Sequence, residues 1–125
     1  MNYILPLPAR QRRCPSQFSW VDQRLARQRY FECASHTAWT LYLFLLTVAD
    51  PQGASYYSER SLCQRLRMAP AQLTQTRREL IERDLLAYRA PIYQVLALNE
   101  AAPVATISTA AQAEHHLKTL RRVLK

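Results

Sequence analysis

The sequence predicts a mainly α-helical protein with a small β-hairpin, an α+β domain of ordinary size. Its 125 residues leave room for one domain, and 49% hydrophobic with 21% charged residues is typical of globular chains. Apolar residues recur at helical spacing through much of the chain, and two short runs of strand-forming residues follow residue 84. We divide the chain into a basic arm over 1–17, a folded domain over 18–98, and a linker with a C-terminal amphipathic helix over 99–125.

The arm is rich in proline and arginine, and its prolines exclude a continuous helix. Its cationic residues are Arg10, Arg12 and Arg13. Basic arms beside DNA-binding domains track the minor groove, whereas the same composition is equally typical of a solubilising or protein-binding tail. Both interpretations stay open on charge pattern alone.

The segment after the arm predicts a short lead-in and a short helix. Residues 18–21 are either a short strand or an extended chain, and 22–31 has the spacing of a helix that buries Leu25. The outward residues of this helix are Arg24, Arg27 and Arg29. They are either phosphate contacts or an ordinary exposed helix face.

A longer helix is predicted over 35–49, with Ser35 as its N-cap. Apolar residues occupy every face of this helix, so it should be buried all round. One face must pack beneath the domain, while the other needs a terminal segment or a second subunit. This surplus face predicts a homodimer through helix 35–49, supported by the C-terminal helix, whose apolar stripe is Ala113, Leu117, Leu120 and Leu124.

The next segments alternate turns with short elements. Asp50-Pro51-Gln52-Gly53 has type I turn residues in their preferred places, and 54–57 predicts a short strand. Ser58 is the N-cap of a helix that ends near Arg67, and Pro70 suits the first position of a helix over 70–83. This last helix buries Leu73, Thr76, Leu80 and Ile81. Strands over 85–88 and 92–98, joined at Arg89-Ala90-Pro91, complete a hairpin.

The order helix, strand, helix, turn, helix, hairpin resembles the winged helix-turn-helix superfamily. The matching residues run from Tyr57-Ser58-Glu59-Arg60-Ser61-Leu62 to Pro70-Ala71-Gln72-Leu73-Thr74, followed by Arg77-Arg78-Glu79-Leu80 and Asp84-Leu85-Leu86. Asp84 stands where the family has glycine, and aspartate tolerates the left-handed conformation better than most residues. A narrower likeness rests on four segments: Phe18-Ser19-Trp20-Val21-Asp22, Leu41-Tyr42-Leu43-Phe44-Leu45, Ser55-Tyr56-Tyr57-Ser58 and Tyr93-Gln94-Val95-Leu96. In these the chain resembles bacterial plasmid replication initiators, primosome-type proteins and helix-turn-helix proteins encoded beside insertion sequences.

The resemblance implies that helix 70–83 enters the major groove of double-stranded DNA. Its outward side chains are of groove-reading types, and the expected base contacts are Gln72, Thr74, Gln75 and Arg78. The expected phosphate contacts are Arg60, Arg65, Arg77 and Arg89, joined by Arg10, Arg12, Arg13, Arg24 and Arg27. Glutamine, threonine and arginine are also the usual residues of a solvated helix face.

The charge is unevenly distributed along the chain. Seventeen Lys+Arg against nine Asp+Glu gives +8, but residues 1–31 hold six arginines and one acidic residue. Residues 32–98 hold seven arginines and six acidic residues, with Glu79, Glu82 and Asp84 along the end of the expected recognition helix. This near-neutral core and the short wing favour an alternative function, a winged-helix adaptor that binds protein and makes no direct DNA contact.

Several other classes are excluded or disfavoured. Phosphate-binding loops need two or three spaced glycines, and Gly53 is the one glycine of the chain. The three cysteines form no C-x-x-C pair, and the histidines have no ligand-spaced partner, so we expect no metal and no cofactor. No nucleophile motif or signal peptide is present, and the apolar run 38–49 is too short for a bilayer. We therefore expect a soluble, cytoplasmic, non-catalytic protein that acts in transcription regulation, plasmid or mobile-element replication, or transposition.

Overall fold

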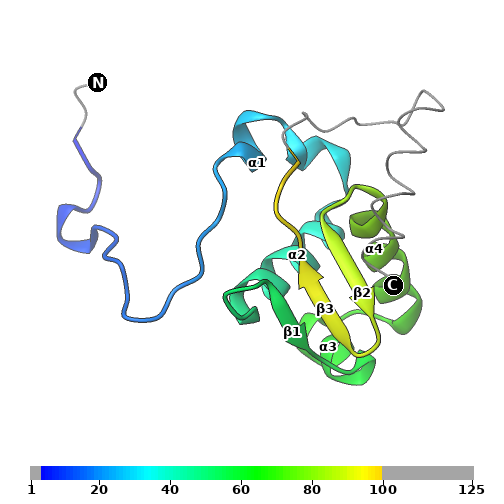
Figure 1. Cartoon of the computed structure of the whole chain (residues 1–125). Helices are drawn as coiled ribbons and strands as arrows, with labels where there is room; N and C mark the ends of the chain where they lie inside the picture. The colour runs from blue at the N-terminus through cyan, green and yellow to red at the C-terminus, as the bar shows by residue number, and fades with distance from the viewer. Residues whose placement is uncertain (1–3, 100–125) are drawn as a thin grey trace.

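Two helices of 13 residues each, α2 (His36–Val48) and α4 (Pro70–Glu82), form the framework of the protein (Figure 1). The computed structural model describes residues 4–99. The shorter helices are η1 (Pro8–Arg10), α1 (Arg24–Arg27), η2 (Tyr30–Cys33) and α3 (Glu59–Leu66). The three strands, described below, make this the α+β fold that the sequence predicts.

The helices start where the sequence places their caps. Ser35 Oγ accepts a hydrogen bond from the Ala38 amide at 3.1 Å, and Ser58 Oγ accepts one from the Ser61 amide at 3.1 Å. These serines satisfy amides that would otherwise lack partners at the first turn. Pro70 occupies the first position of α4, where its missing N–H leaves no hydrogen bond unmade. The predicted starts of α2, α3 and α4 are confirmed.

A three-stranded antiparallel sheet of order β1-β3-β2 packs against the long helices (Figure 1). β2 (Leu86–Arg89) and β3 (Ile92–Val95) form the predicted hairpin. β2 is shifted by one residue from the predicted 85–88, and β3 is shorter than the predicted 92–98. β1 (Ala54–Tyr56) pairs along the other edge of β3. β3 lies against α2, and β2 lies against α4. The sheet therefore fixes the two long helices relative to each other.

The chain's one glycine makes the turn that delivers β1 to the sheet. Gly53 has a φ of 91°, and its amide donates to the Asp50 carbonyl at 2.9 Å. Asp50 Oδ1 accepts from the amides of Gln52 and Ala54, so the predicted turn is confirmed. A Cβ at position 53 would collide with the carbonyl oxygen of Val95. Only glycine suits both the conformation and the close approach to β3.

The core is built mainly of leucines from the long helices and the sheet. Its fully buried large side chains are Leu41, Leu45, Leu62, Leu73, Leu80, Leu85, Leu86 and Tyr93. Trp39 packs edge-on between Phe31 and Tyr42, with ring centroids at 5.1 and 5.2 Å. Phe44 packs on Tyr57 at 5.3 Å. Segments of the same domain thus cover much of the α2 face that the sequence assigned to a terminus or a second subunit.

The predicted helix over 22–31 is wrong as a continuous element. α1 spans only Arg24–Arg27, and Arg29 adopts a left-handed φ of 60° before η2 begins. Leu25 and Tyr30 are both buried, at 2% and 3% exposure. Residues five apart on an unbroken helix point to different sides, so the break lets both side chains enter the core.

The lead-in is extended, and the described part of the arm has no helix or strand apart from η1. Residues 18–21 form no strand, so of the two predicted alternatives the extended chain is the one observed. Ser19 Oγ donates to the Thr47 carbonyl at 3.3 Å. Figure 1 shows the arm leaving the domain on the side away from α4. The expected C-terminal helix lies outside the described residues. Over residues 4–99, no helix combines the length and the hydropathy needed to cross a membrane.

Candidate nucleic-acid interface

The outward face of α4 is a ridge of polar side chains. Leu73, Thr76 and Leu80 are buried, and this stripe fixes which side of the helix faces solvent. The exposed residues at three- and four-residue spacing on the opposite side are Ala71, Thr74, Gln75, Arg78 and Glu82. We call this set the α4 ridge. An open hollow lies along the ridge, and Glu79 also lines it.

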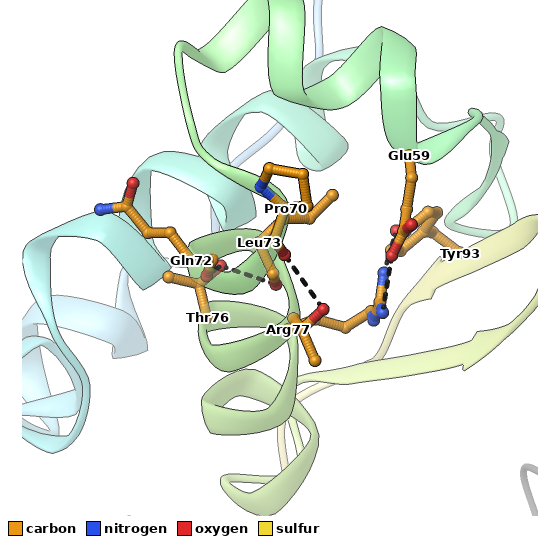
Figure 2. Close-up of polar contacts among 8 residues, drawn as sticks. Glu59, Pro70, Gln72, Leu73, Thr76, Arg77 and Tyr93 are labelled. Atoms are coloured by element: carbon orange, nitrogen blue, oxygen red, sulfur yellow. Dashed lines mark hydrogen bonds and ion pairs between the residues drawn. The ribbon is translucent and has the colours of Figure 1, made fainter.

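Three of the four expected base-contact residues share this ridge. Thr74, Gln75 and Arg78 lie within about one turn of each other, and all are exposed. Gln72 is exposed on the flank of the helix, and Figure 2 shows it extending to the side opposite Arg77. The Thr74 hydroxyl donates to the Pro70 carbonyl at 3.1 Å, which leaves its oxygen available as an acceptor.

Arg77 differs from the other expected phosphate contacts because its guanidinium is held inside the domain. Its Nη1 donates to the Tyr93 hydroxyl at 3.0 Å, and its Nη2 pairs with Glu59 Oε1 at 3.3 Å. The guanidinium also lies 4.3 Å from the centroid of the Tyr88 ring, and only 13% of the side chain is exposed. These contacts hold the guanidinium in the domain rather than presenting it to a ligand.

The remaining expected phosphate contacts are in different settings. Arg60, Arg65 and Arg89 are exposed on α3 and at the end of β2, with the Arg65 guanidinium 5.4 Å from the Phe44 ring centroid. Arg24 forms an ion pair with Asp22 at 2.7 Å, and its hydrogen bonds lower the pKa of that carboxyl. The expected phosphate contacts Arg10, Arg12 and Arg13 of the arm and Arg27 of α1 are all exposed. The structure does not bring the arm to the α4 ridge (Figure 1).

The turn between α3 and α4 carries an exposed arginine that the sequence reasoning did not select. Arg67 ends α3 with a left-handed φ of 57°, and the following Met68 is buried between the helices. An arginine is unusual in this conformation, which glycine adopts without strain. Its position between the two predicted helices was the signal that could have identified it. Arg67 is exposed and follows α3, which carries the exposed Arg60 and Arg65.

Two of the three acidic residues near the end of α4 are engaged within the domain. Glu79 Oε2 accepts from Ser35 Oγ at 2.7 Å, and Glu79 Oε1 accepts from the Ser35 amide at 3.2 Å. Asp84 Oδ2 accepts from Asn99 Nδ2 at 2.6 Å, and Asp84 has the left-handed φ of 61° that its resemblance to the family glycine predicts. Glu82 alone lies exposed on the α4 ridge. The Ser35 and Asn99 partners are neutral groups, so these hydrogen bonds do not offset the carboxylate charges, and the three acidic residues still weigh against an anionic ligand near the end of α4.

Metal and thiol chemistry find little support in residues 4–99. No three His, Cys, Asp or Glu side chains within this range come together as ligands. Cys14 is exposed, whereas Cys33 is buried, and burial raises the pKa of its thiol. A raised pKa keeps a thiol protonated and poorly nucleophilic near neutral pH.

The fold and the site define a mainly helical α+β protein with a polar ridge on its second long helix. Comparisons of the chain with protein-family models, curated proteins and solved structures give no match. The function is therefore inferred from the geometry of the domain itself.

Proposed function

We propose that the protein is a winged helix-turn-helix domain that binds double-stranded DNA without catalysing a reaction. The element order from α2 to β3 and the sheet order β1-β3-β2 support this class. The observation that carries the proposal is the α4 ridge, because it presents Thr74, Gln75 and Arg78 together on a helix whose other faces are anchored. A helix of 13 residues is about 20 Å long and fits the major groove.

The ridge residues have distinct proposed roles. Gln75 can pair with both the N6 and N7 positions of adenine, and Arg78 can pair with O6 and N7 of guanine. The Thr74 methyl suits contact with the methyl group of thymine. Gln72 lies at the edge of the ridge and reads a base at the margin of the site.

The phosphate contacts come from the surface beside the ridge. Arg60, Arg65 and Arg89 keep this role, Arg67 joins them, and Arg77 leaves the set because its guanidinium has partners within the domain. The arm contributes further affinity that depends on salt, since Arg10, Arg12 and Arg13 are exposed. The setting is transcription control, or replication or transposition of a plasmid or mobile element.

A second candidate is a protein-binding adaptor without DNA contact. The wing favours it, because the turn between β2 and β3 holds only Ala90 and Pro91 and projects little beyond the sheet. Salt titration of binding to random duplex DNA separates the two. DNA affinity should fall steeply with salt, whereas an adaptor should show little DNA affinity at any salt.

Selection of bound sequences from a random duplex library tests the proposal most directly. The full chain should enrich a motif, and deletion of residues 1–17 should weaken binding while the motif persists. Arg78→Ala should relax the preference at one position by about tenfold or more, because a bidentate pair discriminates by about 1–3 kcal/mol. An unchanged motif in the Arg78→Ala protein would remove Arg78 from base readout, and no enrichment by the wild type would contradict DNA recognition.

A further inference from the structure

We infer that Arg77 is a positioning residue that sets the orientation of α4 relative to α3 and the sheet. Its consequence for DNA recognition rests on the proposed function, whereas its effect on helix orientation does not. The sequence assigned Arg77 to phosphate contact, so the two roles make opposite predictions.

The first step of the argument is that one guanidinium joins four elements. From α4, Arg77 reaches Glu59 on α3 and Tyr93 on β3 (Figure 2). Its guanidinium also lies over the face of Tyr88 on β2. Tyr88 and Tyr93 are directly opposite each other in the β2–β3 pair, and their ring centroids are 4.4 Å apart. The planar group therefore has one edge on a hydroxyl and a carboxylate, and one face on an aromatic ring.

The second step is that these contacts are needed to keep a largely buried charge. Burial lowers the pKa of Arg77, but its hydrogen bonds and electrostatic interactions with Tyr93, Tyr88 and Glu59 outweigh this and raise it overall. An arginine stays charged in a protein in any case, so this largely buried guanidinium needs its partners, and they hold it at a fixed position. Lysine would lack both the flat face that stacks on Tyr88 and the second donor nitrogen.

The third step is that α4 is held on both flanks. On one flank Arg77 binds the sheet and α3, and on another Glu79 binds the start of α2 through Ser35. The ridge residues Thr74, Gln75 and Arg78 project from the side between these anchors. Arg78 directly follows Arg77, so a change in the angle of α4 displaces the side chains that meet DNA.

The structural test uses the full chain without DNA. Residual dipolar couplings measure the angle between α4 and the β2–β3 hairpin in the wild type, in Arg77→Met and in Arg78→Met. Arg77→Met should change this angle, whereas the exposed neighbour Arg78→Met should leave it at the wild-type value. An unchanged angle in folded Arg77→Met would overturn the inference whether or not the protein binds DNA.

The functional test compares Kd for the selected duplex with Kd for random duplex over a range of salt. Arg77→Met should lower this discrimination about tenfold while the dependence of log Kd on log salt keeps its slope. Arg60→Met, on the exposed surface of α3, should instead reduce the slope by about one with similar discrimination. A slope reduced by one in Arg77→Met would show a phosphate contact, and unchanged discrimination would show a role in stability alone; either result overturns the inference.

Tyr93→Phe keeps the buried ring and removes only the hydroxyl that Arg77 binds. It provides the same test if Arg77→Met does not fold. It should change the α4 angle and the discrimination in the same direction as Arg77→Met but less. Where Arg77→Met folds, the double variant Arg77→Met/Tyr93→Phe should show nearly the same α4 angle and discrimination as Arg77→Met alone, because the two residues act through one contact. Independent, additive effects would contradict a shared anchor.

Discussion

The two long helices have the same length but contribute in opposite ways. α2 is apolar on nearly all sides and buries Ala38, Leu41, Tyr42 and Leu45, whereas α4 buries one stripe and exposes a polar ridge. One polar contact joins the two helices, since Ser35 at the start of α2 donates a hydrogen bond to Glu79 of α4. α2 therefore contributes mainly to stability, whereas α4 presents the exposed polar surface that we propose binds DNA.

Removal of a buried α2 side chain should have the largest effect on stability. Leu41 has no exposed surface, so Leu41→Ala should lower the free energy of unfolding by about 2–5 kcal/mol through lost burial and a cavity. Urea unfolding followed by circular dichroism measures this change. Gln75→Ala on the α4 ridge is the matched control and should stay within about 0.5 kcal/mol of the wild type. A similar loss in both variants would contradict the division between the helices.

Alkaline pH should lower the free energy of unfolding through Tyr42, a buried residue of α2. Burial raises the pKa of Tyr42 from its ordinary value of 10.0 to about 12. The neutral phenol is thus favoured in the folded state, so stability is retained below pH 10 and lost as the pH rises toward 12, by up to about 3 kcal/mol. Urea unfolding between pH 9 and 12 should show a shallower decline for Tyr42→Phe. A residual slope is expected, since burial also raises the pKa of Tyr30 and Tyr93. An equal slope in both proteins would exclude Tyr42 as a main cause.

The contact between the two helices should contribute a smaller amount. Ser35→Ala removes the N-cap of α2 together with the hydroxyl's hydrogen bond to Glu79, while the Ser35 amide keeps its own bond to Glu79. Ser58→Ala removes only the N-cap of α3. A lost cap costs about 1 kcal/mol, so Ser58→Ala should reach that value and Ser35→Ala should exceed it by about 0.5–1 kcal/mol. Thermal unfolding of both variants gives the comparison. Equal losses would show that the hydrogen bond from the Ser35 hydroxyl to Glu79 adds nothing to stability.

The elements that the sequence predicted are those with strong local signals. Ser35, Ser58 and Pro70 mark helix starts through contacts within one turn, and Asp50 and Gly53 define their turn in four residues. The error in 22–31 has a tertiary cause. The helical spacing there is real, but the break at Arg29 follows from burying both Leu25 and Tyr30, and that requires the rest of the core.

The site shows the same limit. The spacing of Thr74, Gln75 and Arg78 was enough to place them on one exposed face, because helical periodicity is local. Arg77 looked equally available from the sequence. Its confinement depends on the strand register that brings Tyr88 and Tyr93 together and on α3 presenting Glu59. Such contacts join residues that no local pattern connects.

The smallest effect is expected at the exposed side of α2. Leu43, 57% exposed, is the one large apolar side chain of α2 that the structure leaves exposed, so the surplus face that motivated a homodimer is smaller than the sequence indicated. Leu43→Lys should change stability by less than about 0.5 kcal/mol, and its mass in light scattering should equal that of the wild type. Ile92→Lys, a similarly exposed apolar site on β3, serves as the control. A wild-type dimer that Leu43→Lys dissociates and Ile92→Lys does not would restore the homodimer hypothesis and give α2 an interface of its own.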